Sequence, residues 1–236
     1  MLWLIGGWSN RPDPLHSSAE RLLRSLQLMP QQPDLYGPWG LWRQRDPDPS
    51  KGAVLIPVDT GDVTAVEQAI TEVTERGNGG KPRTAAGLRA ELSRSVVGER
   101  PPTSPTRFAY NVRAGYIEMN RPFNHVALEL EADTDERILT RYMSALVQAW
   151  QPDHLGAVTQ DIKRAQGQRP PEVSIGRLTY VCDGTPVDRR ALGDQIDVGE
   201  ADGGLYIRVP GTPERPSLED IHRVRNALGY PEPATT

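Results

Sequence analysis

The segment Phe108-Ala-Tyr-Asn-Val-Arg-Ala-Gly-Tyr116 alternates large apolar residues with small or polar ones. A period of two is typical of a β-strand that buries one of its faces. Val126, Leu128 and Leu130 repeat the alternation after a turn expected at Asn120-Arg-Pro122. Two such strands joined by a short connection predict an antiparallel hairpin.

Upstream of this hairpin, the sequence predicts two passages from strand to helix, followed by one more helix. The expected elements are a strand at 2–8, a helix opened by the capping pair Ser17 and Glu20 and stopped by Pro30, a buried strand at 53–58, a helix from the cap Asp62 to Gly77, and a helix over 84–94.

Downstream, we expect a long helix from Asp133 to Trp150, strands at 178–182 and 205–209 joined by an acidic loop, and a last helix capped by Ser217. Strands and helices mix without the regular alternation of a doubly wound fold. The predicted class is therefore α+β, a mixed and largely antiparallel sheet with helices packed on it. The Pro-rich stretch before residue 105 suggests two halves, 1–98 and 105–236, or else one continuous domain.

Composition narrows the classes of function. The net charge of -4 and the absence of clustered cations argue against direct binding of nucleic acid. One cysteine, Cys182, excludes an internal disulfide framework and favours a reducing compartment. No run approaches the roughly 20 apolar residues that cross a bilayer, and residues 1–8 lack a basic leader. A cytoplasmic protein without membrane contact is expected.

Motifs for catalysis are missing from the sequence. The four histidines fall in different expected elements, Gly6-Gly7 fits no phosphate-binding fingerprint, and Cys182 lies on an apolar strand face. We therefore predict no catalytic residue, no metal, no cofactor and no enzymatic activity. An enzyme whose site is assembled from distant residues stays open as an alternative, with the candidates Asp153, His154, Glu129 and Arg113.

Two features suggest a binding surface instead. Acidic residues gather between 183 and 202, where they form either solvated turns or a patch that meets a basic partner. Two tryptophans in a Pro-rich segment are either core residues or interface anchors. The candidate binding residues are Trp39, Trp42, Asp183, Asp188, Asp194, Asp197, Glu200 and Asp202.

Four stretches in order resemble the immunity protein 52 family of bacterial polymorphic toxin systems. They are Leu2-Trp-Leu-Ile-Gly-Gly-Trp-Ser-Asn-Arg11 with the helix at Ser18, Trp150-Gln-Pro-Asp153, Gly176-Arg-Leu-Thr-Tyr180 and Gly203-Gly-Leu-Tyr-Ile207. Arg177 stands where the family usually carries Trp, and the segment 30–49 departs from the family in length and content.

The resemblance implies an antitoxin encoded beside a secreted toxin, which it binds one to one and blocks at the active site or substrate path. Family members are often paired with nuclease toxins of restriction-endonuclease type, so such a toxin is the implied partner. A further alternative is an accessory subunit of a secretion or phage-like assembly that docks through Trp39 and Trp42. Self-association stays open.

Overall fold

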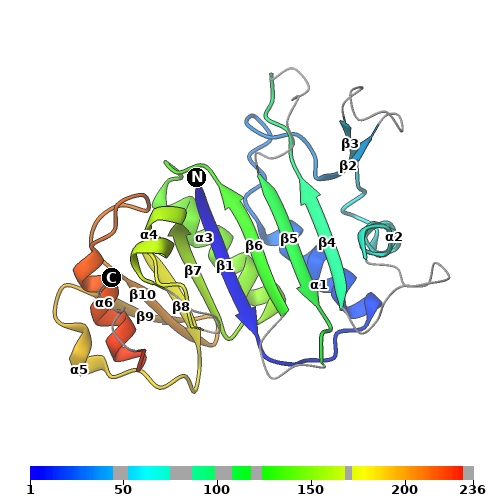
Figure 1. Cartoon of the computed structure of the whole chain (residues 1–236). Helices are drawn as coiled ribbons and strands as arrows, with labels where there is room; N and C mark the ends of the chain where they lie inside the picture. The colour runs from blue at the N-terminus through cyan, green and yellow to red at the C-terminus, as the bar shows by residue number, and fades with distance from the viewer. Residues whose placement is uncertain (45–52, 75–86, 99–107, 118–123, 168–171, 231–236) are drawn as a thin grey trace.

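The computed structural model describes residues 1–44, 53–74, 87–98, 108–117, 124–167 and 172–230. Within these ranges, ten strands form one sheet in the order β3-β2-β4-β5-β6-β1-β7-β8-β10-β9, accompanied by six helices (Figure 1). The α+β prediction is confirmed. All pairings between the described strands are antiparallel, so the sheet is more uniform than the expected mixed one.

The elements have the following bounds. The strands are β1 (Leu2–Trp8), β2 (Gly40–Gln44), β3 (Ala53–Pro57), β4 (Leu88–Ser93), β5 (Ala109–Ala114), β6 (Asn124–Leu130), β7 (His154–Thr159), β8 (Leu178–Cys182), β9 (Asp197–Ala201) and β10 (Gly204–Arg208). The helices are α1 (Leu15–Leu28), α2 (Val63–Val73), α3 (Glu136–Trp150), α4 (Gln160–Ala165), α5 (Arg189–Leu192) and α6 (Leu218–Ala227).

The first strand lies in the middle of the sheet. Leu2 of β1 is opposite Leu130 of β6 on one side and Thr159 of β7 on the other. Residues from both expected halves therefore share one sheet. The boundary expected just before residue 105 lies outside the described residues.

The main core fills the space between the sheet and the helices α1 and α3, which Figure 1 shows behind the central strands. Trp8 of β1 stacks on Trp150 of α3, with ring centroids 5.5 Å apart. The indole Nε1 of Trp150 donates a hydrogen bond to the Tyr110 hydroxyl at 2.7 Å, and that hydroxyl shares another with Ser25 of α1. Burial of these large aromatic side chains locks the strands β1 and β5 to both helices.

A second core lies on the opposite face of the sheet, over β8 and β10. Successive residues of β8 divide between the cores, because Tyr180 points into the first and Val181 into the second. Side chains of α4, α5 and α6 close this second core, represented by Ile162, Leu192 and Ile221. The strands β8 and β10 thus contribute side chains to cores on both faces of the sheet.

Several predictions from the sequence are confirmed. The strand at 2–8, the cap Asp62, the β5–β6 hairpin, the helix ending at Trp150, the strand at 178–182 and the cap Ser217 all match. The turn expected at 120–122 and the helix end expected at Gly77 lie outside the described residues.

Other predictions are wrong. Helix α1 begins at Leu15, directly after Pro14, so Ser17 is inside the helix rather than its cap. The helix expected over 84–94 is the strand β4 from residue 88 on, because Ala90 and Leu92 face the core while β5 supplies the backbone partners. The strand β3 is an exposed edge rather than a buried strand.

The remaining corrections concern β7 and β9. The strand β7 occupies a place where only a turn after the long helix was expected. The expected acidic loop contains α5 and the strand β9. No helix in the described part of the chain has both the length and the apolar character that a membrane span requires.

Candidate functional site

Two turns meet at one end of the sheet. The strand β8 ends at Cys182, and the hairpin β9–β10 reverses at Asp202-Gly203. Asp202 and Gly203 have φ angles of 51° and 75°, as a two-residue type I′ hairpin turn requires. The backbone N–H of Asp183 donates to the carbonyl of Gly203 at 2.9 Å, which fastens the two turns together.

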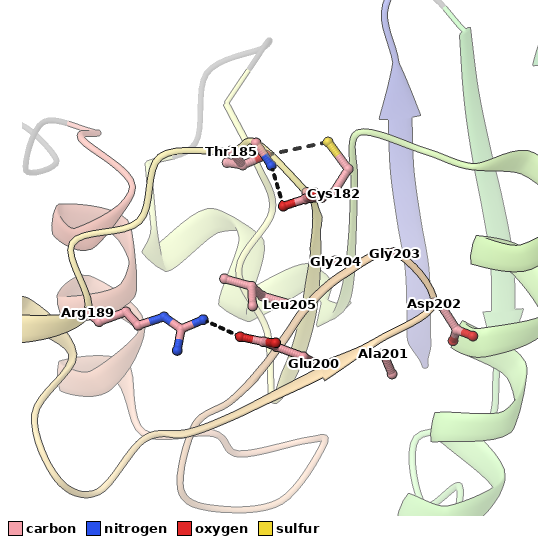
Figure 2. Close-up of a pocket in the computed structure, with 11 residues that line it drawn as sticks. Cys182, Thr185, Arg189, Glu200, Ala201, Asp202, Gly203, Gly204 and Leu205 are labelled. Atoms are coloured by element: carbon pink, nitrogen blue, oxygen red, sulfur yellow. Dashed lines mark hydrogen bonds and ion pairs between the residues drawn. The ribbon is translucent and has the colours of Figure 1, made fainter.

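An open concavity of about 460 Å³ lies between these turns and α5 (Figure 2). Its walls come from the end of β8, from β9 and from the start of β10, and Arg189 of α5 closes one side. The residues that line it are Cys182, Asp183, Gly184, Thr185, Arg189, Glu200, Ala201, Asp202, Gly203, Gly204 and Leu205. Four of them, Asp183, Gly184, Asp202 and Gly203, lie in the two turns, and most of the others lie in strands.

The charge of the concavity is negative. Asp183, Glu200 and Asp202 contribute carboxylates, whereas Arg189 is the single cation among the lining residues. Arg189 pairs with Glu200 at 2.8 Å, but their side chains are 59% and 73% exposed, so solvent screens the pair strongly. A partner cation can therefore compete for Glu200 at little cost.

The buried tyrosine beside the concavity feels this negative field. Burial is the main reason why the pKa of Tyr180 is raised to about 12. The nearby charge of Cys182, followed by those of Asp202, Asp183 and Asp153, raises it further. Negative potential thus gathers at this end of the sheet, which favours a positively charged partner.

Asp202 is held by the protein itself. Its carboxylate accepts hydrogen bonds from Ser144 and Tyr206 at 2.8 Å each, and from Gln148 at 3.1 Å. Burial, followed by this hydrogen bond and the charge of Asp202, raises the pKa of Tyr206. Figure 2 shows the Asp202 carboxylate turned away from the Arg189–Glu200 pair. Asp202 is therefore a brace of the rim, and Asp183 and Glu200 are the carboxylates available at the opening.

The structure separates the other predicted acidic residues from this group. Asp188 caps α5 by accepting from the N–H of Arg190 at 3.0 Å. Asp197 begins β9, opposite Arg208, and Asp194 lies in the turn before it. Four residue steps of about 3.3 Å place Asp197 on the order of 13 Å from the turn end of β9. Of the six predicted carboxylates, the concavity gathers Asp183, Glu200 and Asp202.

The two predicted tryptophan anchors lie elsewhere. Trp39 is only 3% exposed and packs against Phe108 and Tyr110 in the main core, so it is not an exposed anchor. Trp42 is half-buried in β2. This strand pairs with the edge strand β3, at the far end of the sheet from β9. The tryptophans and the concavity therefore cannot form a single patch.

The residues of the alternative enzyme site do not converge. Along β1, Glu129 lies opposite Trp3, whereas His154 lies opposite Gly7, about 13 Å away at 3.3 Å per residue. Arg113 of β5 is three strands away from His154 in the sheet order. Burial lowers the pKa of His154, which favours its neutral form.

Asp153 instead connects three segments of the chain. Its carboxylate accepts from the N–H of Ser9 at 2.7 Å, and its carbonyl accepts from the N–H of Cys182 at 2.9 Å. The Sγ of Cys182 lies 3.5 Å from the Thr185 hydroxyl. In the ranges that the structure describes, no three His, Cys, Asp or Glu side chains come together as a metal ligand set.

Sequence reasoning missed Thr185, Arg189 and Leu205 as lining residues. The dipeptide Asp202-Gly203 was the available signal, because Asp-Gly between alternating residues predicts a tight hairpin. That hairpin implies a strand before the turn, which is β9, and it places the turn beside the concavity.

No family model matches this chain, and no curated protein matches it either. Among solved structures, the fold is similar to that of the Pseudomonas aeruginosa T6SS protein PA0821, with a TM-score of 0.53 and 11% sequence identity. The comparison covers 97% of this chain and 75% of that one. The chain therefore shares its overall fold with a T6SS protein.

Proposed function

We propose that this chain is an immunity protein, an antitoxin that binds a cognate secreted toxin in bacterial competition and blocks its active site or substrate path. The observation that carries the proposal is the acidic concavity beside the β9–β10 turn. Asp183 and Glu200 stand at its opening on a braced rim, and opposite potential steers and selects a protein partner.

The negative charge favours a toxin that acts on nucleic acid. A nuclease binds phosphates in a basic groove, and a carboxylate surface can occupy the place of those phosphates. The resemblance of Gly176-Arg-Leu-Thr-Tyr180 and the other three stretches to the immunity protein 52 family supports the same partner class, a nuclease of restriction-endonuclease type. Such an antitoxin acts in the cytoplasm, needs no cofactor and performs no turnover.

The structural likeness adds a context. A T6SS protein with the same fold supports a role in bacterial competition, since the fold is then found among proteins of a secretion system. The acidic concavity is the main support for an antitoxin role.

The test uses the polypeptide encoded by the neighbouring gene. We expect the purified chain to bind it with a Kd of nanomolar order, about 12 kcal/mol, and to protect cells that express it. The double variant Asp183→Asn with Glu200→Gln should weaken binding at least tenfold and reduce its salt dependence, because both exposed carboxylates lose their charge.

A matched control removes the same charge elsewhere. Asp34→Asn with Asp161→Asn neutralises two exposed carboxylates outside the concavity, so it should leave binding unchanged. Absence of both binding and protection with the wild-type chain would count against the proposal. A product formed by the isolated chain, and lost on changing Asp153 or His154, would favour the enzyme alternative instead.

The fold likeness also favours a second candidate, an accessory subunit of a secretion assembly. Such a subunit would form stable complexes of many copies, by itself or on a tube protein. Light scattering of the purified chain distinguishes the two functions, because an antitoxin is expected as a one-to-one complex with its toxin.

A further inference from the structure

The strand β9 forms one of the two edges of the sheet, and β3 forms the other. It pairs with β10 on one side, and no described strand pairs with its other side (Figure 1). Four of its five residues are exposed, and Val198 is half-buried. The edge also continues into the candidate site, because Glu200 and Ala201 line the concavity.

The hairpin turn determines which backbone groups of β9 face outward. Ala201 and Gly204 flank the two-residue turn and form a hydrogen-bonded pair, so the same holds for every second residue along the strand. The N–H and C=O groups of Gly199 and Asp197 therefore point to β10. Those of Val198 and Glu200 point away from the sheet, toward a strand that would lie alongside.

Of the usual obstacles to strand addition, β9 lacks proline, lysine and a bulge, although it is short and carries Asp197 and Glu200. Proteins block their sheet edges with proline, bulges or lysine. The strand Asp197-Val-Gly-Glu-Ala201 contains neither proline nor lysine, and its register with β10 runs without a bulge. A Cβ added at Gly199 would meet nothing within 4 Å, so the face of the strand over Gly199 is open.

Charge selects the occupant of this edge. Asp197 and Glu200 lie on the strand, and Asp194 and Asp202 flank it. Two acidic edges repel each other, which disfavours pairing with a second copy of the chain. An extended segment that carries Lys or Arg instead meets opposite charge at Asp197 on one face of the strand and at Glu200 on the other.

We propose that the edge of β9 receives an extended basic segment of the protein partner as an eleventh, hydrogen-bonded strand. The inference rests on the proposed function and names the surface and the kind of segment that it uses. Main-chain hydrogen bonds at Val198 and Glu200 supply affinity, and the carboxylates supply selectivity. The adjoining concavity then receives a basic side chain of the same segment near Glu200.

Amide hydrogen exchange tests the pairing directly, with the polypeptide encoded by the neighbouring gene as the probe. Binding should slow exchange at the N–H groups of Val198 and Glu200 at least tenfold. The N–H of Gly199, which already faces β10, should change little. This alternation distinguishes strand addition from general coverage of the hairpin.

Variants at Gly199 give an independent readout. Gly199→Lys adds a cation where the Cβ has open space, and it should weaken binding at least tenfold. Gly199→Glu and Gly199→Ala should bind like the wild-type chain. Glu200→Pro removes one outward N–H and should weaken binding more than Glu200→Gln. If the proline variant does not fold, the Gly199 series still decides.

The outcomes separate the two proposals. If the wild-type chain fails to bind the probe, the proposed function itself is wrong. If it binds, but Gly199→Lys binds equally well and the two amides stay unprotected, only the strand addition is overturned. Concentration-dependent dimerisation of the free chain with protection of the same amides would assign the edge to a second copy, which also overturns the inference.

Discussion

Ser144 of α3 donates a hydrogen bond to the Asp202 carboxylate at 2.8 Å, across 58 positions of sequence. Gln148, one helical turn further along α3, donates to the same carboxylate. The longest helix therefore holds the β9–β10 turn, which forms the rim of the concavity. An acidic residue that sequence charge alone assigns to partner binding has a structural task here.

Replacing Asp202 tests this task. Asp202→Ala loses the hydrogen bonds and places alanine at a positive φ, so the free energy of unfolding should fall by about 1–3 kcal/mol. Ser144→Ala removes one of the bonds and should cost about 1 kcal/mol. The loss of unfolding free energy for Asp202→Asn should lie between those of the other two variants, because asparagine tolerates the positive φ. Urea unfolding measures all three, and equal stability of Asp202→Ala and wild type would contradict the brace.

A second prediction concerns the close approach of two backbones at Gly176. A Cβ there would lie 1.7 Å from the carbonyl oxygen of Ala157, so even alanine must push two segments apart. We expect Gly176→Ala to lower the free energy of unfolding by about 3 kcal/mol or more. Gly199→Ala, where the Cβ has open space, is the matched control and should stay within about 0.5 kcal/mol of wild type.

How far the sequence predicts this fold depends on whether the signal is local. The cap Asp62 and the helix ending at Trp150 depend on neighbours in sequence, and both are confirmed. The apolar residues of β4 also suit a helical spacing, so the sequence alone predicts a helix there. Only pairing with β5, which is distant in sequence, decides between the two.

The candidate site was partly accessible to sequence reasoning. The carboxylates that the sequence gathers between 183 and 202 include Asp183 and Glu200, which the structure brings to one concavity. The sequence does not distinguish these two carboxylates from Asp202 and Asp188. Asp202 accepts a hydrogen bond from the distant residue Ser144, and Asp188 caps the start of α5. Trp39 shows the same limit, since its burial depends on Phe108 and Tyr110.

A third prediction concerns the buried hydroxyl of Tyr110. It accepts a hydrogen bond from Trp150 Nε1 at 2.7 Å, and the side chain is fully buried. Tyr110→Phe leaves the indole N–H without this acceptor and should lower the free energy of unfolding by about 1–3 kcal/mol. Tyr230→Phe, whose ring is only partly buried, is the control and should cost less than about 0.5 kcal/mol. An equal effect of both variants would contradict the prediction.

The last prediction links stability and partner binding through Tyr180. Its pKa is raised to about 12, mainly by burial, whereas an unfolded tyrosine titrates near 10. The folded chain thus keeps a proton that the unfolded chain loses. The contribution of Tyr180 to stability is complete below about pH 10 and is lost as the pH rises toward 12.

Absorbance of tyrosinate, compared with the variant Tyr180→Phe, follows this group. A basic partner bound at the concavity would offset the charge of Asp183, which raises the pKa of Tyr180 together with burial, Cys182, Asp202 and Asp153. Binding should therefore lower the pKa of Tyr180 by the part that this charge contributes, while the part due to burial remains. Added salt should weaken the shift. A pKa of Tyr180 that rises on binding would show that the partner mainly buries the ring, and a pKa that does not move would place the partner away from these carboxylates.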